Sequence, residues 1–394
     1  LITEGPSSLV TVALDMYDGS TKFSLIAIPM FVLAGAIMNA GGVTRRLIEF
    51  VSALIGAVRG GLAMVSIGVS LFFAEISGSA VADVAALGSI MIPEMKKRGY
   101  GAPFAAAVTS SSASLAIIIP PSIPMILYAV SANTSVEQLF VAGFIPGLMG
   151  AIGLMGVSWW FARRYNLPVE EAFNWPRLRR AAIEAGPTFL LPVIILGGIF
   201  GGFVTATEAA GLAVLAAIGV GIWYREVDFR QLHRAMLEGG MQTAVVMVLV
   251  AASVLMGGFL TRAQIPQELA AQMVAFTDSK YVILLILNVF FLIIGFFLHS
   301  AAAIILVVPI VVPLIQQVGI DPVHFGLVVT LNLAIGQQTP PVASVLITAC
   351  SIARANIWEV TRVNLPFIAV LVGVLLICTY VPAIPMFLVE LFYR

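Results

Sequence analysis

The stretch Ser77-Gly78-Ser79-Ala80-Val81-Ala82-Asp83 lies inside an apolar run that extends from Gly60 to Pro93. A carboxylate in the hydrocarbon of a membrane is costly unless it faces a partner or a cavity, so Asp83 is a candidate cation or proton ligand. The apolar segments on either side, 60–76 and 80–95, are each shorter than the roughly 20 residues that a membrane-spanning helix needs. We therefore expect a re-entrant hairpin with a functional site at its tip.

A second copy of this arrangement follows 220 residues later. Six residues recur at that spacing without a gap: Pro93 and Pro313, Gly99 and Gly319, Pro120 and Pro340, Pro121 and Pro341, Ser131 and Ser351, and Pro146 and Pro366. This agreement indicates an internal duplication. Interruptions at matching places in two halves of a membrane protein are typical of a transporter's binding site.

The composition is that of a polytopic α-helical membrane protein, with 60% hydrophobic and 10% charged residues and a mean hydropathy of +1.05. The formal net charge is zero, which gives no indication of nucleic acid binding. Cys350 and Cys378 lie in apolar runs without the spacing of a metal site, and we expect them in the core. No signal peptide is evident. The chain begins with Leu, so we expect that natural N-terminal residues are absent.

The predicted fold is an all-α polytopic membrane protein with two inverted repeats. Each repeat has a re-entrant hairpin and a helix broken by Pro-Pro: residues 1–185 with hairpin 60–97 and broken helix 102–130, then residues 186–394 with hairpin 281–317 and broken helix 322–353. The other expected spans are Phe23–Ala40, Gln138–Phe161, Pro187–Phe203, Glu208–Tyr224, Gly240–Leu260 and Leu365–Leu388. Amphipathic pieces are expected at Thr44–Val58, Asp228–Leu237 and Pro266–Phe276, and a polar segment before Lys22.

The basic residues support this layout. If the first hairpin opens to the cytoplasm and the second to the outside, 16 of the 20 Lys and Arg residues are cytoplasmic. The four others are Lys22, Arg262, Lys280 and Arg394. This asymmetry follows the positive-inside rule and predicts that the two copies have opposite orientations.

The broken helices are expected to bind small cations. A Pro-Pro pair removes two backbone donors and leaves carbonyls of the preceding turn without partners. Nearby Ser, Thr and Asn oxygens would complete an oxygen cage suited to Na⁺. The candidates are Ser110, Ser111, Ser112 and Ser114 in the first copy and Asn332, Gln337, Gln338 and Thr339 in the second. In the alternative, these residues only permit helix packing and kinks.

The substrate is expected between the two hairpin tips. A helix that starts after a break directs its positive end at the site and favours an anionic group. His299, at the second tip, would sense protons or contact substrate, unless its role is structural. Glu75 is a further acidic candidate near the first tip, whereas Thr205 and Glu208 have the spacing of a helix capping box.

Other classes of function have less support. The three histidines form no HExxH motif, no serine has an evident base, and no GxxxxGK[ST] motif occurs, so neither an intramembrane enzyme nor a P-loop ATPase is indicated. An ion channel stays open as an alternative, because re-entrant loops also form selectivity filters. Re-entrant hairpins that enter from both faces of the membrane favour alternating access over a channel.

Four motifs carry a resemblance to a known family. They are Ile76-Ser77-Gly78-Ser79-Ala80-Val81-Ala82-Asp83, Ile119-Pro120-Pro121-Ser122-Ile123-Pro124-Met125, Thr205-Ala206-Thr207-Glu208-Ala209-Ala210, and Gly319-Ile320-Asp321-Pro322-Val323-His324-Phe325-Gly326 with Thr339-Pro340-Pro341-Val342. With these motifs the chain resembles the large membrane subunit, DctM-like, of the tripartite ATP-independent periplasmic (TRAP) transporters. The resemblance covers nearly the whole chain.

The resemblance implies a symporter of the bacterial inner membrane that is driven by sodium, uses no nucleotide and moves as an elevator. It implies a small membrane subunit, which we expect near Phe23–Ala40 and Pro187–Tyr224, and a periplasmic binding protein that delivers a small organic acid. It also implies sodium roles for Ser77, Asp83 and the break at Thr339-Pro340-Pro341. Members usually begin with one more span.

The predicted sites rest on the residue patterns and on the family resemblance together. The sodium ligands are Ser77, Asp83 and Ser112 in the first site and Asn332, Gly336 and Thr339 in the second. The substrate residues are Ser79, Pro121, Ser122, His299, Ser300 and Pro341. The chain departs from the family at His299, Ala301 and Ala343, where an acid, a Thr and a Gly are common, so proton coupling stays open. The alternative function is a single-component organic anion symporter coupled to cations or protons.

Overall fold

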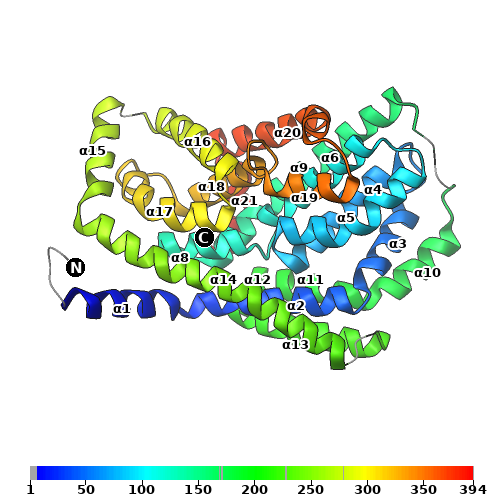
Figure 1. Ribbon diagram of the computed structural model, residues 1–394, viewed down its shortest axis with the longest axis horizontal. Coiled ribbons are helices and arrows are strands. Elements are labelled where there is room, and N and C mark those ends of the chain that lie inside the picture. The colour runs from blue at the N-terminus through cyan, green and yellow to red at the C-terminus, as the bar shows by residue number, and fades with distance from the viewer. Residues whose placement is uncertain (1–6, 168, 170–171, 227–228, 278, 394) are drawn as a thin grey trace.

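A computed structural model describes residues 7–167, 169, 172–226, 229–277 and 279–393, and every regular element in that part of the chain is a helix (Figure 1). The elements are α1 (Ser7–Ser20), η1 (Phe23–Ile26), α2 (Ala27–Ala40), α3 (Val43–Ile55), α4 (Gly61–Ser77), α5 (Ala80–Lys97), α6 (Ala102–Ala113), α7 (Leu115–Ile118), α8 (Ile123–Ala132), α9 (Val136–Arg164), α10 (Trp175–Ala185), η2 (Gly186–Phe189), α11 (Leu190–Pro192), η3 (Val193–Gly197), α12 (Gly198–Phe200), α13 (Ala206–Tyr224), α14 (Phe229–Arg262), α15 (Ile265–Phe276), α16 (Lys280–Phe297), α17 (Ser300–Gln317), α18 (Pro322–Gly336), α19 (Ser344–Ala353), α20 (Ile357–Tyr380) and α21 (Ala383–Tyr393). Nine helices of the described residues are long and apolar enough to cross a membrane.

The helix boundaries follow the spacing of 220 residues found in the sequence. The first hairpin, α4 and α5, would fall on 281–297 and 300–317 after that shift, and the second hairpin, α16 and α17, occupies Lys280–Phe297 and Ser300–Gln317. The first broken helix (α6, α7 and α8) corresponds to the second broken helix (α18 and α19), and both Pro-Pro bonds are cis. These matches support the predicted duplication, while the opposite orientation of the copies stays a prediction.

The two halves interlock. In each half the first arm of the hairpin packs on the first part of its own broken helix, α4 on α6 and α16 on α18. The second arms cross over, so that α5 packs on α19 and α17 packs on α8. The long helix that follows each broken helix packs on the broken helix of the other half: α9 packs on α18, and α20 packs on α6. These helices form the interlocked bundle, which neither half could complete alone.

A second group of helices lies along one side of the interlocked bundle. α2 packs against α13 and α14, and α1 packs against α14. Figure 1 shows these four helices, here called the scaffold layer, along the lower side, with α3 and α15 near opposite ends of the molecule. α3 connects the scaffold layer to the first hairpin, and α15 connects it to the second.

Most predicted boundaries agree with the helices. The segment before Lys22, for which no helix was predicted, contains α1, packed on α14. Two predictions were wrong. The pieces predicted at Asp228–Leu237 and Gly240–Leu260 form one helix, α14, which continues through Gly239 and packs on α2. The last predicted span is divided between α20 and α21. The capping box of Thr205 and Glu208 and the buried positions of both cysteines are confirmed.

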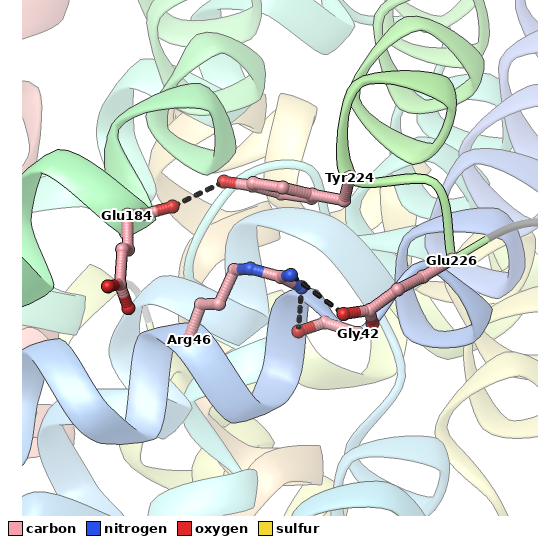
Figure 2. A network of polar contacts seen from close by, with 5 residues as sticks. All are labelled: Gly42, Arg46, Glu184, Tyr224 and Glu226. Carbon is pink, nitrogen blue, oxygen red and sulfur yellow. Dashed lines mark hydrogen bonds and ion pairs between the residues drawn. The ribbon is translucent and has the colours of Figure 1, made fainter.

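A polar network holds α3 to the scaffold layer (Figure 2). Arg46 donates from Nη2 to Glu226 Oε1 at 2.7 Å and from Nη1 to the Gly42 carbonyl at 3.1 Å. Its guanidinium lies 3.7 Å from the centre of the Tyr224 ring, and the Tyr224 hydroxyl donates to the Glu184 carbonyl at 2.7 Å. Arg46 thereby joins the start of α3 to the end of α13, and Tyr224 extends the link to α10.

Replacement of Arg46 by Ala is expected to lower the free energy of unfolding by about 1–2 kcal/mol, because it removes a charged hydrogen bond and a cation–π contact that solvent partly screens. Arg179→Ala, at an exposed position of α10, is the control and should change it by less than about 0.5 kcal/mol. Thermal unfolding in detergent at neutral pH measures both. Equal effects of the two variants would contradict the role of the network.

The same network predicts a dependence on pH. The hydrogen bond from Arg46 lowers the pKa of Glu226 below its ordinary value of 4.5. The ionised carboxylate therefore stabilises the fold at neutral pH, and this contribution is lost as the pH falls below 4.5 through the lowered pKa. The difference in unfolding temperature between wild type and Glu226→Gln should disappear over that range. A difference in unfolding temperature that stays constant over this pH range would show that it does not come from the ion pair.

Candidate functional site

A cavity of about 420 Å³ lies between the interlocked bundle and the scaffold layer. The tips of both hairpins line it, through Ser79 from the first and His299 and Ser300 from the second. Its other walls are the start of α8, Gln337 in the second break, Val32 of α2 and residues of α14. The volume is in the range of small-molecule sites. The structure thus brings together three of the six predicted substrate residues, from segments far apart in the chain.

Three helices begin at this cavity. Its lining includes Ser79 and the first turn of α5, Ile123 and Pro124 of α8, and Ser300 and Ala301 of α17. A helix N-terminus carries a partial positive charge and unbonded N–H groups, which together favour an anion. No Asp, Glu, Lys or Arg stands among the described residues that line the cavity. Its preference for an anion would therefore come from dipoles and neutral donors.

Two side chains of the lining supply such donors. The Nδ1 atom of His299 accepts a hydrogen bond from the Ala301 N–H at 3.4 Å, so the neutral ring carries its hydrogen on Nε2. The Gln337 side chain is buried, and its Oε1 accepts a hydrogen bond from the Ser344 hydroxyl at 3.3 Å. Its Nε2 is buried and has no hydrogen-bond partner in the part of the chain that the structure describes. Gln337, which we predicted as a cation ligand, thus also belongs to the cavity wall.

The other predicted substrate residues do not line this cavity. Ser122 is fully buried, and its hydroxyl donates to the Ile117 carbonyl at 2.7 Å, before the break. Pro121 is buried, with its carbonyl against the first tip: a Cβ on Gly78, whose φ is +59°, would lie 2.7 Å from it. Pro341 is exposed. These three residues shape the breaks that position the tips.

Each break is bonded to its own hairpin through the backbone. The Ile123 N–H donates to the Gly78 carbonyl at 3.4 Å in the first half. The Val342 N–H donates to the Phe296 carbonyl at 3.1 Å in the second. The two halves therefore use equivalent contacts, and each hairpin supplies a partner to the backbone that its Pro-Pro pair interrupts.

The predicted residues of the second cation site have structural contacts of their own. Asn332 donates to Asn288 Oδ1 on α16 at 2.7 Å and to the Val328 carbonyl at 2.8 Å. The Thr339 hydroxyl donates to the Ile335 carbonyl at 3.1 Å. Gly336 lies where α18 crosses α16, and a Cβ on it would lie 2.5 Å from the Cα of Gly295.

Ala343, also in this break, has a φ of +42°, a conformation that favours glycine. This is the position at which the chain departs from the glycine that is common in the family.

The predicted residues of the first cation site lie on three helices that pack together, α4, α5 and α6. Asp83 is fully buried in the first turn of α5. Ser112 is fully buried on α6, accepts a hydrogen bond from the Ser70 hydroxyl at 2.9 Å and donates to the Thr109 carbonyl at 3.1 Å. Ser77 is the last residue of α4, and its side chain lies outside the described part of the structure.

Several buried oxygens near these segments suit a small hard cation. The atoms Glu75 Oε2, Thr109 Oγ1, Ser110 Oγ and Asn332 Oδ1 are buried without a hydrogen-bond partner among the described residues. Unpaired buried oxygens are costly unless a cation or a water satisfies them. Ligands of this kind fit Na⁺, which prefers oxygen. The donor set therefore agrees with a cation at each broken helix.

Sequence reasoning missed four contributors to these sites. Gln242, Val245 and Val246 of α14 line the cavity, and Asn364 of α20 contacts both halves through Ser111 and Gln338. The available signal was an amide side chain within a long apolar helix, Gln242 in α14 and Asn364 in α20.

Comparison with known proteins identifies the family. The model of the family described as "Tripartite ATP-independent periplasmic transporter, DctM component" matches residues 1–384. The chain belongs to this family. The resemblance found in the motifs is thereby confirmed.

Individual TRAP transporter proteins are similar over almost the whole chain. The isethionate TRAP transporter permease protein DctMQ of Oleidesulfovibrio alaskensis is 41% identical, over 98% of this chain and 61% of that protein. The C4-dicarboxylate TRAP transporter large permease protein DctM of Pseudomonas aeruginosa is 38% identical, over 96% and 89%. The sialic acid TRAP transporter large permease protein SiaM of Vibrio cholerae is 36% identical, over 100% and 92%.

A solved structure agrees on the fold. The crystal structure of the Alcanivorax borkumensis YdaH transporter matches with a TM-score of 0.68 and 15% identity, over 96% of this chain and 88% of that one. At this identity the likeness concerns the fold alone. Together with its apolar helices, membership of the TRAP family makes the chain a multi-pass inner-membrane permease component and not an enzyme, as predicted.

Gly336 gives a test of the contact between α16 and α18. Gly336→Ala is expected to destabilise the protein by about 1–3 kcal/mol, because its Cβ would overlap the backbone of Gly295. Gly373→Ala on α20 is the matched control, since nothing lies within 4 Å of a Cβ there. Thermal unfolding of both variants in detergent is the measurement. If Gly336→Ala were as stable as Gly373→Ala, the close crossing of the two helices would be wrong.

Proposed function

We propose that this chain is the large permease subunit of a sodium-coupled TRAP transporter that imports a small organic acid by elevator-type alternating access. The observation that carries the proposal is the cavity between the interlocked bundle and the scaffold layer, lined by both hairpin tips. A substrate at this boundary would be exposed to one side or the other if the bundle moved along the scaffold layer. The relatives are named as transporters of isethionate, C4-dicarboxylate and sialic acid, all organic acids.

The sodium ions would bind at the two broken helices. Asp83 and Ser112, with the hairpin end at Ser77, are proposed for the first site. Asn332 and Thr339, with the Gly336 carbonyl, are proposed for the second. Unpaired buried oxygens support this assignment, because a cation would satisfy them: Asn332 Oδ1 belongs to the second site, and Thr109 Oγ1 and Ser110 Oγ lie on α6 with Ser112. In this arrangement each ion would stabilise a break beside a hairpin tip and so prepare the substrate cavity.

The partners of the proposal are a small membrane subunit and a periplasmic substrate-binding protein. The family description is that of a tripartite transporter in which DctM is one component. The scaffold layer and the segment α10–α12 expose large apolar side chains, among them Val193, Leu215 and Trp223. We propose that this surface binds the small subunit and that the other exposed apolar surfaces contact lipid.

The decisive experiment is uptake into proteoliposomes that contain the permease, its small subunit and a candidate binding protein. Wild type should transport only with an inward Na⁺ gradient and the binding protein. Asp83→Asn is expected to reduce the initial rate at least about tenfold, since it removes a charged ligand. Asp18→Asn, at an exposed position, is the control and should transport normally.

Each other outcome has a definite meaning. Uptake without the binding protein would overturn the tripartite proposal in favour of a single-component symporter. Uptake driven by a pH gradient alone would overturn sodium coupling and shift the coupling role to His299. Unsaturable flux would indicate a channel.

Substrate affinity tests the cavity independently. His299→Ala and Gln337→Leu should each raise the KM for the organic acid about 10-fold or more, because each removes a donor to a charged group. The sodium concentration at half-maximal rate should change little for His299→Ala, because the ring is placed at the substrate and not at an ion. Gln316→Ala, exposed at the end of α17, is the control. An unchanged KM in both cavity variants would contradict the proposed substrate position.

A further inference from the structure

A fully buried group of four polar side chains joins the two broken helices. They come from α6, from the turn after it, from the second break and from α20: Ser111, Ser114, Gln338 and Asn364. Each has 0% of its surface exposed. Unbonded polar groups in a membrane protein are expensive, and polar residues buried within membrane segments are candidates for a functional role.

Gln338 is the centre of the group. The Ser111 hydroxyl donates to Gln338 Oε1 at 2.9 Å, and Asn364 Nδ2 donates to the same oxygen at 3.3 Å. Gln338 Nε2 in turn donates to the Ser114 hydroxyl. One amide in the second break is thus bonded at both ends to the serine run of the first broken helix.

The neighbours of these residues in sequence are the proposed cation ligands. Ser111 precedes Ser112 of the first site, and Gln338 precedes Thr339 of the second. Gln337, on the other side of Gln338, lines the substrate cavity. A cation that shifts either break will therefore shift one end of the bond between Ser111 and Gln338.

The bond also has an alternative arrangement. Besides Gln338 Oε1, the Ser111 hydroxyl has a second acceptor, Asn364 Oδ1 at 2.5 Å. A serine hydroxyl carries a single hydrogen and can donate it fully to only one of them. Coupling between two sites requires an element with two arrangements that both sites bias. The Ser111 hydroxyl, between Gln338 and Asn364, is such an element.

We infer that Gln338, through Ser111, couples the two sodium sites, so that occupation of one raises the affinity of the other. The inference rests on the proposed function, because it requires two sodium sites. Gln338, a cation candidate in the sequence, is a positioning residue in this scheme, because its amide is bonded to Ser111, Ser114 and Asn364. The reciprocity of coupling means that its loss weakens both sites equally.

The test measures sodium binding and transport in the permease with its small subunit. The change of unfolding temperature with Na⁺ concentration in detergent gives a Hill coefficient for binding, and initial uptake in proteoliposomes gives the half-saturating Na⁺ concentration. The Hill coefficient for binding to wild type should exceed one. Gln338→Ala and Ser111→Ala should each bring it to about one and raise the half-saturating Na⁺ concentration about fivefold or more.

The double variant and a control separate coupling from stability. If Ser111 and Gln338 act through one bond, the double variant should be no worse than either single variant. Gln317→Ala, exposed at the end of α17, should behave as wild type. A purely structural role would lower the unfolding temperature without Na⁺ and leave the Hill coefficient unchanged. Ser111→Ala removes one oxygen only and keeps the test valid if Gln338→Ala does not fold.

The outcomes distinguish this inference from the proposed function. A Hill coefficient unchanged in both single variants, or equal to one in wild type, overturns the inference while sodium-driven uptake upholds the proposed function. Absence of any sodium effect on wild-type binding and uptake overturns both.

Discussion

Within the hydrocarbon of a membrane no water is available to a backbone group that a broken helix leaves unbonded. Both Pro-Pro breaks of this chain meet that constraint in the same two ways. A nearby hydroxyl bonds a carbonyl of the preceding turn, Ser122 to Ile117 and Thr339 to Ile335. A carbonyl of the adjacent hairpin accepts an N–H just after each break, from Ile123 in the first half and from Val342 in the second. These hydrogen bonds therefore hold the hairpin and the broken helix of each half together.

The interlocked packing extends this constraint to the whole bundle. Because α5 packs on α19 and α17 on α8, each hairpin is also held against the broken helix of the other half. The buried bonds of Gln338 add a polar link between the two broken helices. In the elevator mechanism that we propose, the bundle would therefore move as a unit. The scaffold layer, which contacts the bundle through α2 and α14, is the surface against which such a unit would move.

The sequence predicted the hairpins, the breaks and the capping box to within a few residues, because proline, glycine and capping residues mark them locally. It did not predict the course of α14: glycine in a helix costs only about 1 kcal/mol, and packing on α2 outweighs that cost. Nor did it predict that the hydroxyls of Ser122 and Thr339 bond backbone carbonyls. Partners such as Gln338 and Asn364 are separated from Ser111 by more than half the chain, and no local pattern in one sequence shows such contacts.

The absence of a charged residue from the described cavity lining has a physical rationale in a carrier. A fixed arginine would hold an organic acid more tightly, but the empty carrier would then have to move an unpaired charge within a medium of low dielectric constant. Helix N-termini, His299 and Gln337 offer donors that are neutral when no substrate is bound. The cation sites at the breaks would supply positive charge only when sodium occupies them. Affinity for an anion would then rise with sodium binding and fall on its release, which is the condition that tight coupling of the two fluxes requires.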